Sequence, residues 1–315
     1  MNSTHDRLDQ FQEAFVKNFI LVLLGVIINY INGTFVFAFF NSQIFYNDPR
    51  YILYIHMVIN DMIMLSLSVT LHVVSYIWPF LNVSVCCVLL IIADATHKNT
   101  PLNLASMAIE RYIAVCNPLR HAQICTVRRT YVLIGIIWGV GAMPGLTDLV
   151  IMLAVNPPSL FSSALLCFSL NIYNTQYHKE KSTVLQSLYI SFVWITLIYT
   201  YFRVLFAAKA ATTDPVSARK AQNTILLHGV QVLLSMMSYI TPLVDRVLLQ
   251  LFPQERTKIM FVSFLFSNIL PRLLSPLIYG VRDQKLAKHV RGYLLCKVSV
   301  RKVKPVHTWS THSSE

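Results

Sequence analysis

Charged residues are scarce in this chain of 315 residues. Asp, Glu, Lys and Arg make up 13% of it, whereas soluble domains usually have about 25%. Hydrophobic residues make up 55%, so a water-soluble globule of this size would lack the polar side chains to cover its surface. A disordered chain would be far less apolar. Together with a mean hydropathy of +0.54, this composition indicates an integral membrane protein.

The sequence also lacks the parts of common catalytic and cofactor sites. It contains no phosphate-binding glycine loop, no His/Cys metal spacing and no nucleophile elbow, so we expect no enzyme, no metal site and no cofactor. Six cysteines spread along the chain are too few for a disulfide scaffold. The net charge of +12 is carried between apolar runs and not by a soluble domain, so we expect no nucleic-acid partner.

Seven apolar runs are each long enough to cross a bilayer as a helix, which takes about 20 residues. These predicted spans are Asn18–Phe40, Tyr51–Trp78, Val85–Val115, Thr130–Ile151, Val184–Ala208, Asn223–Leu249 and Lys258–Gly280. The third is the least regular, since polar residues interrupt it. The pattern predicts an all-α membrane protein, a seven-transmembrane helix bundle over residues 18–280.

The flanking segments complete the predicted organisation. Residues 1–17 form an outer N-terminus, 281–297 a short amphipathic eighth helix at the membrane interface, and 298–315 a disordered cytoplasmic tail. In the eighth helix an apolar stripe, formed by Leu286, Val290, Tyr293 and Leu294, lies opposite basic residues, which is typical of interfacial helices. Cys296 at its end is a candidate for palmitoylation, with a free thiol as the alternative.

The distribution of basic residues predicts the orientation. With the N-terminus outside, seventeen of the 26 Lys and Arg residues lie on the cytoplasmic side and seven on the outer side, as the positive-inside rule requires. No cleavable signal peptide is evident, because the first apolar run is too long for one. Two glycosylation triplets, at Asn2 and Asn82, fall on the outer side.

The cysteines separate by compartment. Cys86, Cys87 and Cys167 are predicted to lie outside, and the other three in the cytoplasm. One outer disulfide is therefore possible, and free thiols are the alternative. A bond to Cys167 would hold the long second outer loop over the bundle and stabilise the fold by about 3–4 kcal/mol.

Residues 107–121 read MAIERYIAVCNPLRH. This stretch closely resembles the MAxDRYxAICxPLxY signature of odorant receptors, within the rhodopsin-like G-protein-coupled receptors, and its details are most similar to fish-type odorant receptors. Further matches follow in family order along the chain: Asn32, Pro49-Arg50-Tyr51, Asp61, Cys86, Trp138, Pro242 and Ser275-Pro276-Leu277-Ile278-Tyr279. Ser275 departs from the usual Asn and weakens the polar network between spans two and seven.

The resemblance implies a function and its partners. It implies a plasma-membrane receptor, in the cilia of sensory neurons, that binds a small odorant and activates a heterotrimeric G protein of the stimulatory or olfactory type. It also implies a Cys86–Cys167 disulfide. The residues implied in activation are Glu110, Arg111, Tyr112, Pro118 and Tyr279. In this interpretation Glu110 holds Arg111 at rest; the alternative is a snorkelling pair without a switching role.

The ligand site is expected among the outer halves of the spans, where a bundle can enclose a cavity. Asp94, His97 and Lys98 share one helical face. A charge at this depth indicates a functional site, yet Asp94 and Lys98 can also pair with each other, so ligand contact and an internal pair both stay open. The further candidates, with packing or interface anchoring as the alternative, are His72, Tyr76, Tyr189, Trp194, Tyr239 and Asp245.

Asp61 and Arg272 form a predicted intramembrane polar pair. In the resembled family the second-span Asp faces the seventh span and often helps to hold a sodium ion. Since either charge alone would be costly to bury, a guanidinium there is expected to contact Asp61 directly or through water and to take the place of the sodium ion.

The sequence is compatible to different degrees with other classes of membrane protein. A non-olfactory rhodopsin-like receptor for an amine or a peptide is the nearest alternative, and a membrane transporter is a weaker one, because the chain shows no internal repeat. A retinal pigment is disfavoured, since the seventh span carries only Lys258, at its outer end. Ligand identity, G-protein type and oligomeric state do not follow from the sequence.

Overall fold

The computed structural model describes most of the chain: residues 2–78, 80–167, 172–173, 175–211, 230, 233–234, 237, 240–241, 244–282, 286 and 288–290.

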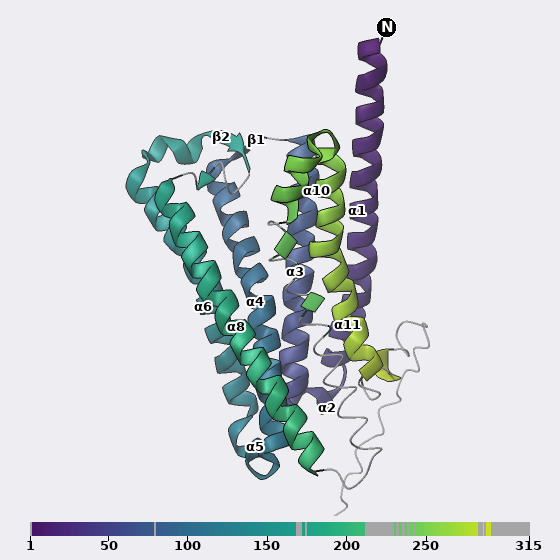
Figure 1. Ribbon diagram of the computed structural model, residues 1–315, viewed down its shortest axis with the longest axis vertical. Helices are drawn as coiled ribbons and strands as arrows, with labels where there is room; N and C mark the ends of the chain where they lie inside the picture. Colours follow the sequence, from purple (N-terminus) through teal and green to yellow (C-terminus); the bar gives the residue numbers. More distant parts are fainter. Residues whose placement is uncertain are drawn as a thin grey trace, which may run out of the picture.

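Long helices lie side by side and make up nearly the whole described molecule (Figure 1). They are α1 (Asn2–Phe40), α3 (Pro49–Ile77), α4 (Val83–Cys116), α6 (Val127–Val155) and α8 (Gln176–Ala211). A further rod consists of α10 (Arg256–Phe264), a π-helical stretch η3 (Leu265–Ile269) and α11 (Leu270–Arg282). The short elements are α2 (Gln43–Tyr46), α5 (Pro118–Ile124) and the 3₁₀ turns η1 (Pro158–Ser162) and η2 (Pro253–Glu255).

Five helices within the described residues are long and apolar enough to cross a membrane: Gln12–Phe40, Pro49–Ile77, Val127–Val155, Gln176–Ala207 and Pro253–Ile278. The third predicted span corresponds to α4, which has 34 residues and would reach about 51 Å at 1.5 Å per residue. The sixth predicted span lies largely outside the described residues, and only its C-terminal part, from residue 244, is described continuously as helix.

Helix ends differ from the hydropathy boundaries. α1 begins at Asn2 and not at residue 18, and α8 begins at Gln176, eight residues before the predicted span. Hydropathy marks only the part of a helix that lies in hydrocarbon, whereas backbone hydrogen bonding continues into polar sequence. One end of the bundle holds α2 and α5 (Figure 1) and is called the inner end, after the predicted orientation; the opposite end is called the outer end. At the inner end, capping sets the starts of α3 and α6: Asp48 accepts from the backbone N–H of Arg50, and Thr126 accepts from that of Arg129.

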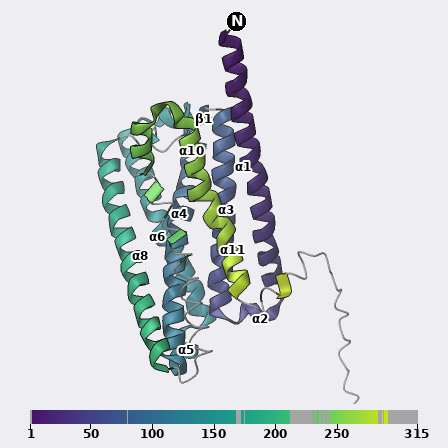
Figure 2. The ribbon, with the colours of Figure 1, turned by 45° about the vertical axis from the view of Figure 1, so that its right-hand side comes forward.

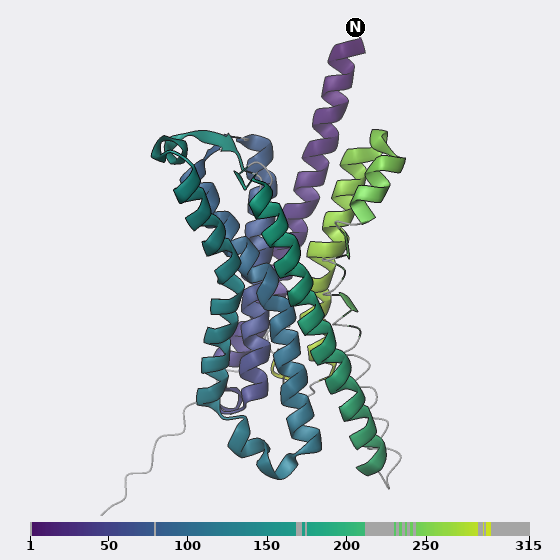
Figure 3. The same cartoon turned by 60° about the vertical axis from the view of Figure 1, so that its left-hand side comes forward.

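The helix α4 is the centre of the bundle and packs against α3, α6 and α8 (Figures 2 and 3). It buries polar side chains as well as apolar ones, among them Thr96, Asn99, Asn103 and Glu110. Because a buried polar group needs a hydrogen-bonding partner in a membrane, these residues mark where α4 joins its neighbours.

A two-stranded ribbon lies at the outer end, which the all-α prediction did not include. Strand β1 (Phe80–Asn82) pairs antiparallel with β2 (Ala164–Leu166), with Phe80 opposite Leu166 (Figure 1). The strands are three residues long, too short to give a periodic signal in the sequence.

The largest apolar cluster lies toward the inner end, around Tyr54, Phe45 and Met57. Leu286 and Val290, two residues of the predicted eighth-helix stripe, are buried in it, and the ring of His289 lies 5.3 Å from that of Phe45. The two stripe residues that the structure describes therefore face the bundle. Tyr293, Leu294 and Cys296 fall outside the described residues.

Candidate functional site

The inner end of α4 carries a buried carboxylate between two basic side chains. Glu110 is 6% exposed. Its Oε2 lies 3.6 Å from Nε of Arg111, and its Oε1 lies 3.0 Å from Nε2 of His121. Asn117 ends α4 and Pro118 begins α5, so the chain turns back there and brings His121 to the carboxylate.

Each oxygen of Glu110 thus has its own basic partner, one on α4 and one on α5. Charge-assisted contacts to a poorly hydrated carboxylate are stronger than those in water. Loss of either contact would leave Glu110 partly unpaired and favour a different arrangement of this end. The expectation that Glu110 contacts Arg111 agrees with this geometry. His121 was not predicted, although it stands where the odorant-receptor signature has Tyr.

The other residues implied in activation lie at the same end. The ring of Tyr112 is 6.1 Å from that of Tyr199, which connects α4 with α8. Pro118 is exposed at the first position of α5. Tyr279 lies on α11, but its side chain is outside the part of the structure that is described.

In the outer half of α4, Lys98 donates a hydrogen bond to Asp94. The structure thus shows the internal pair, one of the two interpretations of these charges. The Asp94 side chain is nevertheless 40% exposed, so it stays partly accessible while the pair is intact. Tyr189 on α8 donates to the backbone carbonyl of Lys98. This contact places an aromatic ligand candidate directly beside the charged pair.

The remaining predicted ligand residues are spread over several elements. The ring of His72 on α3 lies 5.4 Å from that of Phe264 on α10, and Asp245 accepts a hydrogen bond from Ser263. Trp194 and Tyr189 on α8 both pack against the buried cluster around Val193, whereas Tyr76 is exposed. Tyr239 lies outside the described residues.

A second charged cluster joins α6 to α8 at the outer end and was not predicted. Asp148 on α6 accepts from Lys181 on α8, which also donates to the carbonyl of Pro144 at 3.0 Å. Nε2 of His178 lies 3.6 Å from Oδ1 of Asp148. The signal in the sequence is weak, because the two sides of the cluster are thirty or more residues apart.

The outer disulfide is present between Cys86 at the start of α4 and Cys167 just after β2. It holds the second outer loop against the bundle, together with the β1–β2 ribbon. Cys87 is buried beside it as a free thiol, 3.8 Å from the sulfur of Met152. Burial raises the pKa of Cys125, which lies between α5 and α6, and the nearby charge of Glu110 raises it further, so this thiol is weakly nucleophilic.

Asp61 and Arg272 are both buried in mid-bundle, each 2% exposed. Asp61 accepts from the Thr100 hydroxyl at 3.1 Å. Arg272 donates to the carbonyl of Ser267 at 2.7 Å and lies against the sulfur of Met64. The structure records no hydrogen bond or ion pair between these two described side chains. The expected direct contact is therefore absent, and the water-bridged form stays a prediction.

A histidine connects three helices nearby. Nε1 of Trp138 on α6 donates to Nε2 of His56 on α3 at 2.8 Å, and Nδ1 of His56 lies 2.8 Å from Oδ1 of Asn103 on α4. Since indole can only donate, Nε2 must accept and Nδ1 must carry the proton. The imidazole is thus neutral, and its tautomer is fixed by its neighbours.

Comparison with known proteins decides the family. The sequence model described as "7 transmembrane receptor (rhodopsin family)" matches residues 31–279. The chain belongs to the rhodopsin family of seven-transmembrane receptors. It is therefore a multi-pass membrane protein and a signalling receptor, not an enzyme.

The receptor is similar to odorant and olfactory receptors of Danio rerio and Homo sapiens. It is 31% identical to Odorant receptor 131-2 of Danio rerio over 282 residues, which cover 89% of this chain and 86% of the relative. It is 24% identical to Olfactory receptor 2M5 of Homo sapiens over 90% of this chain and 87% of the relative. It is 22% identical to Olfactory receptor 2M3 of Homo sapiens over 88% of this chain and 85% of the relative.

The predicted modification sites of the receptor have clear positions in the chain but stay predictions. Asn82 caps α4 by accepting from the backbone N–H of Ser84 at 2.9 Å, and it is exposed at the outer end. Asn2 begins α1, and its side chain is not among those described.

Proposed function

We propose that the receptor detects a small odorant in the outer half of its bundle and activates a heterotrimeric G protein at its inner end. The observation that carries this proposal is the Glu110 carboxylate, buried and held by basic groups from both α4 and α5. The names of the relatives, which extend over most of this chain, supply the chemical class of the ligand.

The inner contacts supply a two-state element. At rest Glu110 engages Arg111 and His121 and keeps α5 close to α4. When a ligand favours a different packing of the outer half, Arg111 leaves Glu110 and moves toward the core, and the crevice that opens receives the G protein. A ligand shifts this equilibrium only by its difference in affinity for the two states.

The outer half provides polar groups for ligand recognition. Asp94 and Lys98 are paired, and the partly exposed carboxylate of Asp94 can accept from a ligand that donates a hydrogen bond. Tyr189 and Trp194 add aromatic surface on the adjacent helix. His72, His97, Tyr76, Tyr239 and Asp245 complete the proposed set. An odorant that competes for one member of the pair would release the other, so ligand charge is the property to vary first.

The membrane setting is part of the proposal. We place the N-terminus, the β1–β2 ribbon and the disulfide outside the plasma membrane, and α2 and α5 in the cytoplasm, with sensory cilia as the location. The excess of Lys and Arg on the α5 side supports this orientation. The G protein is proposed to be of the stimulatory, olfactory type.

We further propose that Asp61 and Arg272 compensate each other's charge through a bridging water and that no sodium ion binds there. Support comes from the burial of both groups and from the absence of another charge partner for Asp61 among its described contacts. A guanidinium already near the carboxylate would repel a second cation.

The test is a screen of amines, acids and neutral odorants in cells, read out as cyclic AMP. Because removing one member of a partly buried pair leaves an unpaired charge, Asp94→Ala and Lys98→Ala are compared with the neutral double variant Asp94→Asn/Lys98→Gln. The proposal is supported if the wild type responds to odorants and the double variant, at normal surface expression, prefers different ones. A response only to a transmitter amine or peptide would instead favour a non-olfactory receptor. Ligand uptake without a rise in cyclic AMP would favour a transporter.

A further inference from the structure

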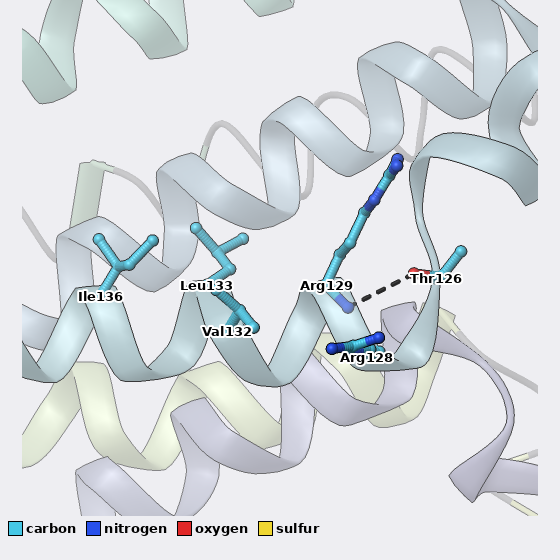
Figure 4. A pocket seen from close by; sticks show the side chains of 6 residues that line it. All are labelled: Thr126, Arg128, Arg129, Val132, Leu133 and Ile136. Atoms are coloured by element: carbon cyan, nitrogen blue, oxygen red, sulfur yellow. Dashed lines mark hydrogen bonds between the residues drawn. The ribbon is translucent and has the colours of Figure 1, made fainter.

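A shallow groove lies at the inner end of α6, and its lining shares no residue with the proposed ligand region or with the Glu110 contacts (Figure 4). Its volume is about 430 Å³, within the range of about 300–1,000 Å³ that is usual for small-molecule sites. Its lining comes from the start of α6 and the residue before it: Thr126, Arg128, Arg129, Val132, Leu133 and Ile136. The groove is basic at one end and apolar over the next two turns.

The lining residues share a face because of their spacing. Arg129, Leu133 and Ile136 follow one another at i, i+4 and i+7, which places them on one side of an α-helix. Val132 and Ile136 are 58% and 55% exposed. In a membrane-spanning helix such side chains face hydrocarbon, so the apolar end of the groove is open to lipid.

The basic end has no acidic partner in the chain around it. No Asp or Glu occurs between Glu110 and Asp148. Glu110 is already shared by Arg111 and His121, and the structure pairs neither Arg128 nor Arg129 with a described acidic side chain. Two positive charges therefore meet at the start of α6 without a counter-ion among the side chains that the structure describes.

Arg129 is held in place by neutral acceptors. Its Nη1 donates to the carbonyls of Gln123 at 3.0 Å and Ile124 at 3.2 Å, at the end of α5. A guanidinium has five N–H donors, so its other donors remain for an anion. Arg128 extends in a different direction from the same turn (Figure 4) and is exposed, so its charge faces the surroundings.

We propose that this groove binds an anionic phospholipid of the cytoplasmic leaflet. The head-group phosphate lies at Arg128, within reach of Arg129, and one acyl chain lies along Val132, Leu133 and Ile136. Charge complementarity selects the acidic head group. The apolar end of the groove belongs to the span predicted over Thr130–Ile151 and so lies at bilayer depth. It therefore selects a hydrocarbon tail, and an acidic peptide of the G protein would not reach it. The choice of leaflet rests on the orientation proposed above.

The experiment measures lipid bound to the full-length receptor purified in detergent, by mass spectrometry under native conditions. The probes are phosphatidylserine and phosphatidylcholine with identical acyl chains. Arg128→Gln is compared with Arg120→Gln, which removes an exposed charge from α5 outside the groove. Ile136→Trp, which fills the groove, is compared with Val140→Trp, one turn further along α6. Thermal unfolding of each variant checks that it is folded.

We expect the wild type to retain phosphatidylserine in preference to phosphatidylcholine. Arg128→Gln should weaken phosphatidylserine binding about fivefold, as expected for one basic residue at a membrane surface, and Ile136→Trp should weaken it by a similar factor. Arg120→Gln and Val140→Trp should leave it within about twofold. Arg128→Lys should also bind nearly as the wild type, which separates charge from fold.

Three results would overturn the inference. The first is equal binding by wild type and Arg128→Gln, and the second is equal loss in Arg120→Gln, which would indicate diffuse charge attraction. The third is displacement of the lipid by millimolar inorganic phosphate with no effect of Ile136→Trp, since that describes a phosphate site without a tail groove. Should Arg128→Gln fail to fold, the Ile136→Trp and Val140→Trp pair decides alone.

Discussion

At the scale of single residues, Gly141 on α6 faces the buried amide of Asn99 on α4. A Cβ atom at position 141 would overlap the Asn99 side chain and lie 3.1 Å from the carbonyl oxygen of Ala95. Gly139, on the same helix, has no atom within 4 Å of such a Cβ. Close approach of α4 and α6 thus requires glycine at one position and not at the other.

We therefore expect Gly141→Ala to destabilise the receptor by about 1–3 kcal/mol, the usual cost of overpacking. Gly139→Ala should be neutral or slightly stabilising, because alanine favours helix. Thermal unfolding of the purified proteins measures both. Equal midpoints for the two variants would show that α4 and α6 do not approach each other in this way.

Residue types along α4 could be predicted to matter, but their partners could not. The odorant-receptor signature placed Glu110 beside Arg111, and helical spacing placed Asp94 and Lys98 on one face, where the structure pairs them. His121, Lys181 and His178 were missed because their contacts depend on how α5 and α8 return to the bundle. Asp61 and Arg272 are both buried, yet α11 directs the guanidinium to Ser267 and Met64.

At the scale of elements, the second outer loop is fixed at two points. The β1–β2 ribbon pairs it with the chain between α3 and α4, and the Cys86–Cys167 disulfide joins it to α4 across 81 residues of sequence. Closing so long a loop reduces the freedom of the unfolded chain. The ribbon alone, with three residues in each strand, is too short to hold the loop.

Removal of the disulfide should therefore lower stability markedly. We expect Cys167→Ser to reduce the free energy of unfolding by about 2–5 kcal/mol, measured by thermal unfolding from intrinsic fluorescence. Cys87→Ala, which removes the neighbouring free thiol, is the matched control and should cost about 1 kcal/mol or less. A reductant should lower the unfolding midpoint of the wild type and leave that of Cys167→Ser unchanged. An unchanged midpoint of the wild type in reductant would exclude a stabilising role for this bond.

Element type and order were largely predictable, since long apolar runs in a bilayer can only be helices or barrel strands. The ends were less so, because α1 and α8 continue into polar sequence. The β1–β2 ribbon and the π-helical stretch η3 have no periodic signal of their own. Both arise from tertiary packing, and η3 supplies the Ser267 carbonyl that accepts from Arg272.

At the scale of the whole molecule, α4 connects the two ends. It carries the disulfide cysteine in its first turn, the Asp94–Lys98 pair in its outer half, Asn99 and Asn103 in the middle, and Glu110 in its last two turns. Because α3, α6 and α8 all pack against it, a change in its position would alter contacts at both faces. This arrangement supports a receptor in which ligand binding outside and G-protein binding inside are linked.

The most direct test of that link is nucleotide exchange on a stimulatory G protein, with purified receptor in lipid nanodiscs. Exchange should rise on addition of an odorant found in the screen. Glu110→Gln, which weakens the hold on Arg111 and His121, should raise exchange without odorant about fivefold. Asp48→Asn, at the Asp48–Arg50 pair of the same inner face, should leave it unchanged. If neither odorant nor Glu110→Gln alters exchange, the account is contradicted.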